Sequence, residues 1–528
     1  MIKEIRKRPF LRLLFFWITG ILLQNHLPCR LYSWGLLVLG LAIIVCTQHP
    51  RIRCRYEYNW LWGSGFSCLV LFLSIQTMAF SSDKLKWSLP VSEKITVVAE
   101  LTDSPSEKTR SYLCDMKVIA QLPDGNPLSG QRVQVYFPKD SMLFSLLPGN
   151  LLLLNMSFMP PGHRNEPLGY MNYLHSNQIV ASGYCPSGSW TQLPRSDTSL
   201  PIRYYALHIR HKLVKQIEKL SLTDTEKATL SALTFGYKSA VDKETMSDFS
   251  TTGVMHIISV SGFHVAIVCA FISFLMSFFP NSIGFHLLRY GVTVAVVWGF
   301  VYVSGLSSPA VRAGLMLTFF LTGRILSRRA DSYNILAASA FLMLVYNPYY
   351  LFDTGFQLSY IAVFFILYLQ PRLNRLIEIR NPILSTPWSW TTVTVAAQAG
   401  TTPLSLYAFG RFSLVFLLTN IPVAAIATLL IPLTLGWTIF SQLVPSLTWL
   451  QMIVEKLTRS LLWIVTSFGR IPGASFTFTI GFIEMLFAYG IVGFLLFYIR
   501  RRTPISLLAG LSCLLIILLI MLKERFVY

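Results

Sequence analysis

One hydrophobic stretch of the sequence, Met255 to Val268, carries an unusual density of polar residues. It reads MHIISVSGFHVAIV and contains His256, Ser261, Gly262 and His264 within a run long enough to enter a bilayer. A polar group buried in hydrocarbon costs several kcal/mol unless it is paired. We therefore expect these side chains to be stabilised by a partner, by water or by a polar ligand.

The residue types of this stretch could support two chemistries, nucleophilic catalysis and metal binding. Ser261 and His264 are three residues apart, which on a helix is the minimum geometry for a hydroxyl activated by an imidazole. A hydrolase also needs an acid to orient the imidazole, and the stretch contains none. Gly262 favours a helix break or a close helix contact instead. His256 and His264 are two turns plus about 80° apart on a helix, so a shared metal is not predicted.

Three further polar residues lie in other apolar stretches. GLSSPAVRAGLML places Arg312 just inside a helix that Pro309 can start, TGFQLSYIAV contains Gln357, and AAQAGTTPLSLYAFG contains Gln398. Singly, each is explained as a residue that joins one helix to another. Together with the histidines, they indicate a polar path through several membrane spans.

The composition requires a membrane to hold these stretches. Of 528 residues, 53% are hydrophobic and only 13% are charged, and the mean hydropathy is +0.54. These values exclude a soluble protein and indicate an integral membrane protein. The net charge of +20 resides in the loops between apolar runs, whereas residues 81–200 carry ten basic and ten acidic residues. Membrane topology alone explains that excess, so the charge is weak evidence for a nucleic-acid partner.

Residues 1–80 contain three apolar runs, which we predict as three transmembrane helices. The basic start resembles a signal peptide, but no small-residue cleavage site follows the first run. The basic clusters at the N-terminus and at Arg51 to Arg55 favour the cytoplasm. This places the N-terminus inside and residues 81–250 outside.

Residues 81–200 change to alternating stretches bounded by turn residues: KITVVAEL, YLCDMKVIA, QRVQVYFP, NLLLLNMSF and QIVASGYC. Five short strands predict a small OB-like β-barrel, with a generic sandwich as the alternative. Cys114 and Cys185 are predicted to form a disulfide, because they alone among eight cysteines lie in this outer domain; two buried thiols are the alternative.

Residues 201–250 are predicted as amphipathic and connecting helices. The first, at 201–220, places Leu213, Ile217 and Leu220 on one stripe and basic residues such as Arg210 away from it. It fits either a helix lying on the membrane surface or a helix packed on the barrel. Residues 251–528 then contain about ten apolar runs, so the whole chain is predicted as a polytopic all-α membrane protein with about 12–13 transmembrane helices.

These motifs resemble the ComEC family of competence proteins. The resemblance rests on GVMHIISVSGFHVAIV, GLSSPAVRAGLML, NPYYLFDTGFQLSYIAVFFIL and AAQAGTTPLSLYAFGRFSLVFLLTNIPVA, and on NEPLGYMNYLHSNQIVASG in the β region. It implies a channel in the plasma (inner) membrane that passes single-stranded DNA into the cytoplasm during natural transformation. The proposed translocation path is then lined by His256, Ser261, Gly262, His264, Arg312, Gln357 and Gln398.

The chain departs from the family pattern in two places. Leu168, Gly169, Tyr170 and Met171 stand where the family has Gly followed by Phe-Asp. The chain also ends at Tyr528 without the metallo-β-lactamase-like domain, with its His-x-His-x-Asp-His motif, that many members carry. We therefore expect no enzymatic activity, no cofactor and no metal site.

The resemblance also implies partners beyond single-stranded DNA and the lipid bilayer. These are a separate nuclease, a DNA receptor and a cytoplasmic helicase, and the chain itself is a candidate homo-oligomer. Two other functions remain open, because a fold does not fix a substrate: a transporter of small molecules or lipids, and a structural component of an uptake apparatus.

Overall fold

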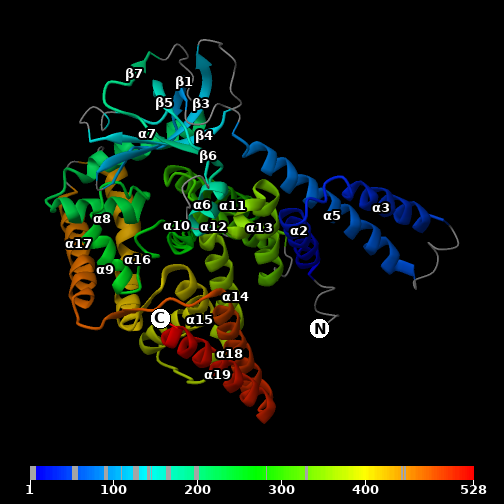
Figure 1. Ribbon diagram of the computed structural model, residues 1–528. Coiled ribbons are helices and arrows are strands. Elements are labelled where there is room, and N and C mark those ends of the chain that lie inside the picture. The colour runs from blue at the N-terminus through cyan, green and yellow to red at the C-terminus, as the bar shows by residue number, and fades with distance from the viewer. Residues whose placement is uncertain are drawn as a thin grey trace. The chain divides into compact units, whose positions relative to one another are not determined.

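The structure is a computed structural model in which helices predominate (Figure 1). It describes residues 8–49, 58–87, 93–108, 110–122, 130–139, 143, 146–161, 168–194, 201–280, 282–326, 331–441, 444 and 447–527. Contacts within the chain divide it into two compact units. Unit 1 comprises Met1–Lys215, Tyr237–Ala240 and Val268–Phe356, and unit 2 comprises Gln216–Gly236, Val241–Ile267 and Gln357–Tyr528.

Unit 1 begins with three helices that match the predicted apolar runs: α2 (Pro9–His26), α3 (Ser33–Thr47) and α5 (Asn59–Lys84). Helices α3 and α5 lie side by side (Figure 1). They approach closely at two glycines, since a Cβ added to either Gly40 or Gly65 would lie 2.9 Å from the other's carbonyl oxygen. Small residues permit such contacts between membrane helices.

The predicted strands are confirmed, and two short strands accompany them. The strands are β1 (Lys94–Leu101), β2 (Ser106–Glu107), β3 (Ser111–Leu122), β4 (Arg132–Pro138), β5 (Leu151–Ser157), β6 (Ile179–Tyr184) and β7 (Trp190–Leu193). Buried and outward residues alternate along them, as in a sheet with one face on a core. The core includes the fully buried Val97, Met116, Val135 and Leu154.

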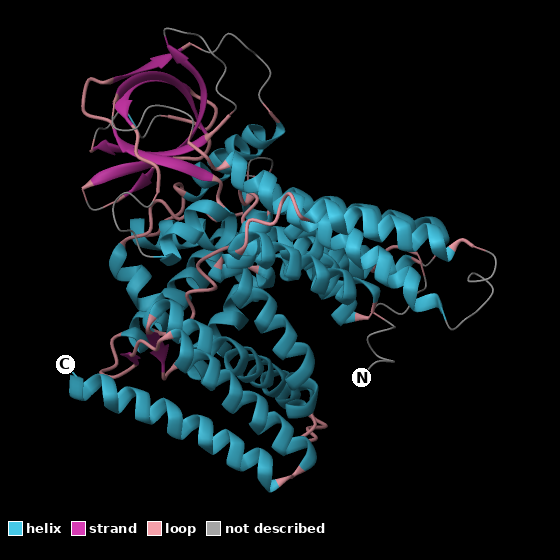
Figure 2. Ribbon diagram, turned by 45° about the vertical axis from the view of Figure 1, so that its right-hand side comes forward, coloured by secondary structure: helices cyan, strands magenta, loops and turns pink. Residues whose placement is uncertain are grey.

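The sheet is strongly curled (Figure 2), but its pairing does not close into a complete barrel. Among the described strands the order is β6–β4–β3–β1–β5–β7, and β2 pairs with β3. The pairing of β4 with β6 is parallel, whereas β4 with β3 and β1 with β5 are antiparallel. One isolated bridge, between Met159 and Ser182, joins the chain after β5 to β6.

The predicted disulfide is wrong, because Cys114 and Cys185 are both free and buried in the core of the sheet. Cys114 is on β3 and pairs with Val135 of β4, while Cys185 follows β6 on the other side of β4 and binds Tyr136 through its backbone. Two strand spacings, about 9.5 Å, separate such positions. A disulfide requires Cα atoms closer than about 7 Å.

Helix α7 (Ile202–Ile217) packs on the sheet region, which supports the second of its two sequence interpretations. Arg210 was expected to face away, but it is buried and forms an ion pair of 2.6 Å with Asp103. The Nε2 atom of His208 lies 3.0 Å from the carbonyl oxygen of Pro148. These contacts fix the helix to the loops of the sheet.

The rest of unit 1 is helical. The short helix α6 (Leu168–Ser176) lies between β5 and β6. The other elements follow later in the chain: α11 (Ile283–Val303), α12 (Ser308–Ile325), α13 (Ser332–Tyr346) and the 3₁₀ helix η3 (Pro348–Phe352). Asp331 caps α13 through the backbone N–H of Asn334 and pairs with Arg8 at 3.1 Å. The ring of Trp17 on α2 packs edge-on against Phe341 on α13. The N-terminal helix is therefore anchored to a helix far along the chain.

Unit 2 contains the remaining elements. They are α8 (Asp224–Phe235), α9 (Lys243–Thr251), α14 (Thr354–Asn374), α15 (Pro382–Phe409), β8 (Arg411–Ser413), α16 (Phe416–Phe440), α17 (Thr448–Gly469), β9 (Ser475–Thr477), α18 (Phe482–Arg501) and α19 (Pro504–Val527); α10 (Gly262–Met276) begins in unit 2 and continues in unit 1. A capping box between Thr223 and Glu226 starts α8, and Gly236 ends it in the left-handed conformation. Strands β8 and β9 form a small separate sheet.

The described residues contain six helices that are long and apolar enough to cross a membrane. They are Trp60–Lys84, Gly284–Val303, Thr354–Asn374, Phe416–Phe440, Phe482–Ile499 and Pro504–Leu522. Three shorter apolar helices accompany them, at Ser33–Thr47, Gly262–Met276 and Ser332–Tyr346. The protein is therefore a multi-pass membrane protein, although these helices are fewer than the 12–13 spans predicted.

Candidate functional site

The polar stretch identified in the sequence begins as irregular backbone and not as a helix. Residues 254–261 follow α9 without helical structure, and α10 starts only at Gly262. Four apolar side chains of the segment, Val254, Ile257, Ile258 and Val260, are buried, whereas Met255 is exposed. This segment, residues 254–261, is called the broken segment below.

A tight turn leads into the broken segment. Gly253 has φ of +77°, and a Cβ there would lie 3.0 Å from side-chain atoms of Ser413 and Phe416. Only glycine adopts this conformation without strain, and only glycine fits the space. The hydroxyl of Thr419 donates to the carbonyl of Thr252 at 2.8 Å, which fixes the turn against α16. The path of the broken segment is thus determined on both sides of the turn.

The predicted contact between Ser261 and His264 is present, and it caps α10. The Ser261 hydroxyl lies 2.9 Å from Nδ1 of His264, and the backbone N–H of Ser261 donates to the same atom at 3.2 Å. His264 therefore accepts from the residue before the helix, as a Glu or Gln does in a capping box. The local geometry accounts for both residue types without catalysis.

The pair lacks what a nucleophile would need. His264 is 0% exposed, so no substrate reaches the ring in this conformation. Its Nε2 faces the backbone at Ile257 but forms no hydrogen bond of normal geometry, and no carboxylate orients it. His256 is exposed, whereas His264 is buried. Among the described residues, no group of three or more His, Cys, Asp or Glu side chains could hold a metal ion.

Arg312 is the largest fully buried side chain described. It is 1% exposed and lies in the first turns of α12. Its guanidinium donates to the Ser308 hydroxyl at 2.7 Å and to the Gly355 carbonyl at 3.1 Å, and it lies over the ring of Phe356. These contacts repay part of the cost of burying a cation. Arg312 faces neither lipid nor an open surface in this conformation.

The other predicted path residues lie on separate helices. Gln357 is near the start of α14 and Gln398 is in the middle of α15, and both are half-buried. The hydroxyl of Thr402 donates to the Gln398 carbonyl, next to Pro403, and α15 continues through this proline. Of the predicted set, the contacts described bring together only Ser261 and His264. The shared path stays a prediction.

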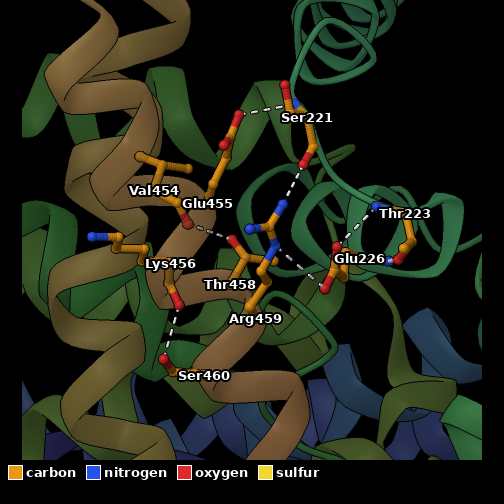
Figure 3. A network of polar contacts seen from close by, with 9 residues as sticks. All are labelled: Ser221, Thr223, Glu226, Val454, Glu455, Lys456, Thr458, Arg459 and Ser460. Atoms are coloured by element: carbon orange, nitrogen blue, oxygen red, sulfur yellow. Dashed lines mark hydrogen bonds and ion pairs between the residues drawn. The ribbon is translucent and has the colours of Figure 1, made fainter.

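A polar network on α17 was not predicted (Figure 3). The backbone N–H of Ser221 donates to the Glu455 carboxylate at 2.8 Å. The guanidinium of Arg459 donates to the backbone carbonyl of Ser221. Arg459 also lies 3.9 Å from the carboxylate of Glu226, which closes the capping box of α8. We call Ser221, Glu226, Glu455 and Arg459 the α8 clamp. Its sequence signal was the pair Glu455 and Arg459, which are four residues apart on α17.

A second missed cluster lies on the outward face of the sheet. Gln134 is 2% exposed, although it is polar and faces away from the core. Its amide donates to Asp115 at 3.0 Å, and its carbonyl oxygen accepts from the Tyr170 hydroxyl at 3.3 Å. Helix α6 therefore covers the middle of this face. Burial raises the pKa of the Asp115 carboxyl, because a carboxylate loses hydration there.

Comparison with known proteins identifies the family. The model of the family described as "Competence protein" matches residues 233–503, just over half of the chain. The chain belongs to the Competence protein family. The matched range includes the broken segment, the Ser261–His264 cap and Arg312, and it holds all seven of the predicted path residues.

Two curated proteins are similar to this competence-family chain. ComE operon protein 3 of Bacillus subtilis is 25% identical over 397 residues, which cover 71% of this chain and 48% of that protein. Recombination protein 2 of Haemophilus influenzae is 28% identical over 306 residues, which cover 55% of this chain and 37% of that protein. The chain thus spans half or less of the length of these relatives. No solved structure matches it.

Proposed function

We propose that this chain forms a channel that passes single-stranded DNA across the plasma membrane during natural transformation. Membership of the Competence protein family, over residues 233–503, is the observation that carries the proposal. The polytopic character of the chain, with six described helices able to span a membrane, is consistent with a conducting protein. The names of the two relatives refer to competence and recombination and agree with the same process.

The broken segment supports a channel over a purely structural role. In a bilayer, irregular backbone is tolerated only where protein buries it or where it lines a water-filled space. The segment carries His256, which is exposed, next to the fully buried Ile257. A polar side chain that is accessible beside buried irregular backbone is what a translocation path requires. We therefore keep His256, Ser261 and His264 in the proposed path.

The decisive experiment is deletion of the gene in the native host, followed by transformation with DNA that carries a selectable marker. We expect transformation to fall to background and to return when the intact gene is supplied in trans. Uptake of small molecules and growth without selection should not change. If transformation persists in the deletion strain, the transporter alternative replaces the channel.

We further propose the orientation and the nature of the sheet. The basic residues favour a cytoplasmic N-terminus with residues 81–250 outside. An OB-like module is supported by five main strands, by the parallel pairing of β4 with β6 and by the bridge from Met159 to Ser182.

We also propose that the chain conducts DNA without cutting it. Hydrolysis of a phosphodiester at a useful rate generally needs a metal held by a cluster of acids and histidines. A separate nuclease, a DNA receptor and a cytoplasmic helicase then act with the channel, which is itself a candidate homo-oligomer. Purified protein incubated with DNA and Mg²⁺, Mn²⁺ or Zn²⁺ should leave single and double strands intact.

A further inference from the structure

The outward face of β3, β4 and β6 carries the strongest unassigned surface in unit 1. Along β4, Val133, Val135 and Phe137 are buried in the core, so Arg132, Gln134 and Tyr136 point outward. Residues that pair directly across strands share a face. Lys117 of β3 pairs with Arg132, and Tyr184 of β6 pairs with Tyr136. One edge of this face is therefore aromatic, and the other carries Lys117 and Arg132, with the buried Glu100 of β1 paired across from Lys117.

Helix α6 adds a further ring to this surface. The rings of Tyr170 and Tyr173 are stacked with centroids 6.2 Å apart, and the hydroxyl of Tyr170 binds Gln134. Tyr173 is 47% exposed and Tyr184 is 54% exposed. Tyr136 lies close to Tyr173, near enough for their ionisations to interact. Tyr136, Tyr173 and Tyr184 thus form a row of rings, of which Tyr173 and Tyr184 are exposed and Tyr136 is half-buried; it is called the tyrosine row below.

The end of α13 and η3 extends the same surface. The side-chain amide of Asn347, itself buried, donates to the Ser176 carbonyl at the end of α6 at 2.8 Å. The rings of His175 and Tyr349 pack against each other, with their centroids 5.4 Å apart. These contacts hold the corner after α13 against α6, within unit 1. Tyr346, the last residue of α13, is 75% exposed and lies near Arg132.

The charges beside the tyrosine row favour an anion. Burial and then the neighbouring Arg203 lower the pKa of Arg132, so two guanidinium groups are held close together. The Nε atom of Arg203 is buried and makes no hydrogen bond. Of the nearby carboxylates, Asp115 accepts from Gln134 and has a raised pKa, and Asp353 accepts from the backbone of Phe356. An anion between the arginines would relieve their repulsion.

We propose that this surface binds single-stranded nucleic acid, with bases stacked on Tyr136, Tyr173 and Tyr184 and phosphates on Lys117, Arg132 and Arg203. Aromatic rings interleaved with basic groups are the common means of holding an unpaired strand, because every base offers a face for stacking. A duplex keeps its bases stacked on one another and cannot use the rings. The inference rests on the proposed function and names the place where the strand is held before entry.

The test measures binding by the full chain in detergent micelles. The probe is a fluorescein-labelled oligothymidylate of 16 nucleotides, read by fluorescence anisotropy. We expect the double variant Tyr173→Ala/Tyr184→Ala to bind about 25-fold or more weakly, since each stacked base contributes a factor of roughly five or more. Tyr173→Phe/Tyr184→Phe should bind as the unchanged protein does, because the rings remain. Arg132→Gln should weaken binding and flatten its salt dependence.

The matched control is Tyr205→Ala, which removes a tyrosine that is 53% exposed on α7 outside the row. It should leave binding unchanged. Equal binding by the double alanine variant, or a duplex that binds as tightly as the single strand, would overturn the inference. Absence of any strand binding by the unchanged chain would overturn it too. None of these outcomes touches the proposed function, because transformation of the deletion strain decides that separately.

Discussion

At the scale of single residues, burial decides what the polar side chains of the membrane region do. The sequence predicted the contact between Ser261 and His264 from their spacing, and that contact is present. It did not predict that the contact is a helix cap, because this depends on where α10 begins. The apolar run gives no sign that its first part is irregular. Likewise, a buried Arg312 could be predicted, but its partners Ser308 and Gly355 could not, since Gly355 follows 43 residues later.

His264→Ala should lower the free energy of unfolding by about 1 kcal/mol, because the helix loses its capping acceptor. His264→Gln is the matched control, since glutamine fills the same position in capping boxes. The measurement is denaturant or thermal unfolding of the purified chain in detergent. Equal loss in the alanine and glutamine variants would show that the ring, and not the cap, matters. Transformation by an equally abundant His264→Ala protein then reports any role in the path.

Asp115 should make the stability of the sheet depend on pH. Burial raises the pKa of its carboxyl above the usual 3.8, so the folded protein holds this proton more tightly than the unfolded chain. Stability therefore falls as pH rises from 3.8 through the raised value. Asp115→Asn keeps an acceptor for Gln134 and should remove this dependence. Hydrogen exchange of β3 and β4 against pH measures it; identical pH profiles for the two proteins would contradict the prediction.

At the scale of elements, patterns with a strict period were predictable and polar clamps were not. The five main strands follow from the alternation of apolar residues, which fixes the face that each side chain occupies. The pairing order β6–β4–β3–β1–β5–β7 does not follow from this alternation. The disulfide between Cys114 and Cys185 was predicted wrongly because the sequence does not show which strands are neighbours. Helix α17 is fixed to the start of α8 by Glu455 and Arg459, contacts that the sequence pattern does not predict. The amphipathic helix α7 fitted both a membrane-surface position and packing on the barrel. The sequence does not show whether lipid or protein covers its apolar stripe.

The α8 clamp should control how often the start of α8 opens. Glu455→Ala removes the acceptor of the Ser221 N–H and should lower the opening free energy there by about 1 kcal/mol. Hydrogen exchange of residues 221–230, followed by mass spectrometry, measures this opening. Lys456→Ala is the control, because Lys456 is next in sequence and its side chain takes no part in the clamp (Figure 3). Equal exchange in both variants would mean that the clamp does not hold the helix.

Both thiols of the sheet should be unreactive in the folded protein. Burial raises the pKa of the Cys114 thiol to about 12 and that of Cys185 to about 11, so neither forms the reactive thiolate at neutral pH. A maleimide added without reductant should label them only after denaturation, and should then label both. Lack of labelling after denaturation would restore the disulfide.

At the scale of the whole molecule, composition predicted a multi-pass protein with a separate β region. The number of spans was harder, because six described helices meet the length and hydropathy of a span and others are short or interrupted by polar residues and proline. An apolar run does not show whether its helix packs against protein or faces lipid. The division into 1–80, 81–200, 201–250 and 251–528 stays a prediction from composition.

Orientation is tested at Cys54, which lies outside the described residues. We expect it to be cytoplasmic, since Arg51, Arg53 and Arg55 surround it. An impermeant thiol reagent added to intact cells with a permeable outer envelope should leave it unlabelled, and disruption of the membrane should expose it. Labelling in intact cells would reverse the topology of the whole chain.

The parallel pairing of β4 with β6 also governs the timing of assembly. Strand β1 pairs with β5, and β4 pairs with β6, which is synthesised only after α6. The antiparallel strands β1, β3 and β4 can pair in chain order, but the sheet cannot be completed until β5 and β6 have been made. By then α2, α3 and α5 have already been synthesised. The close contact of Gly40 with Gly65 thus gives the nascent chain a finished anchor before its slowest-folding part exists.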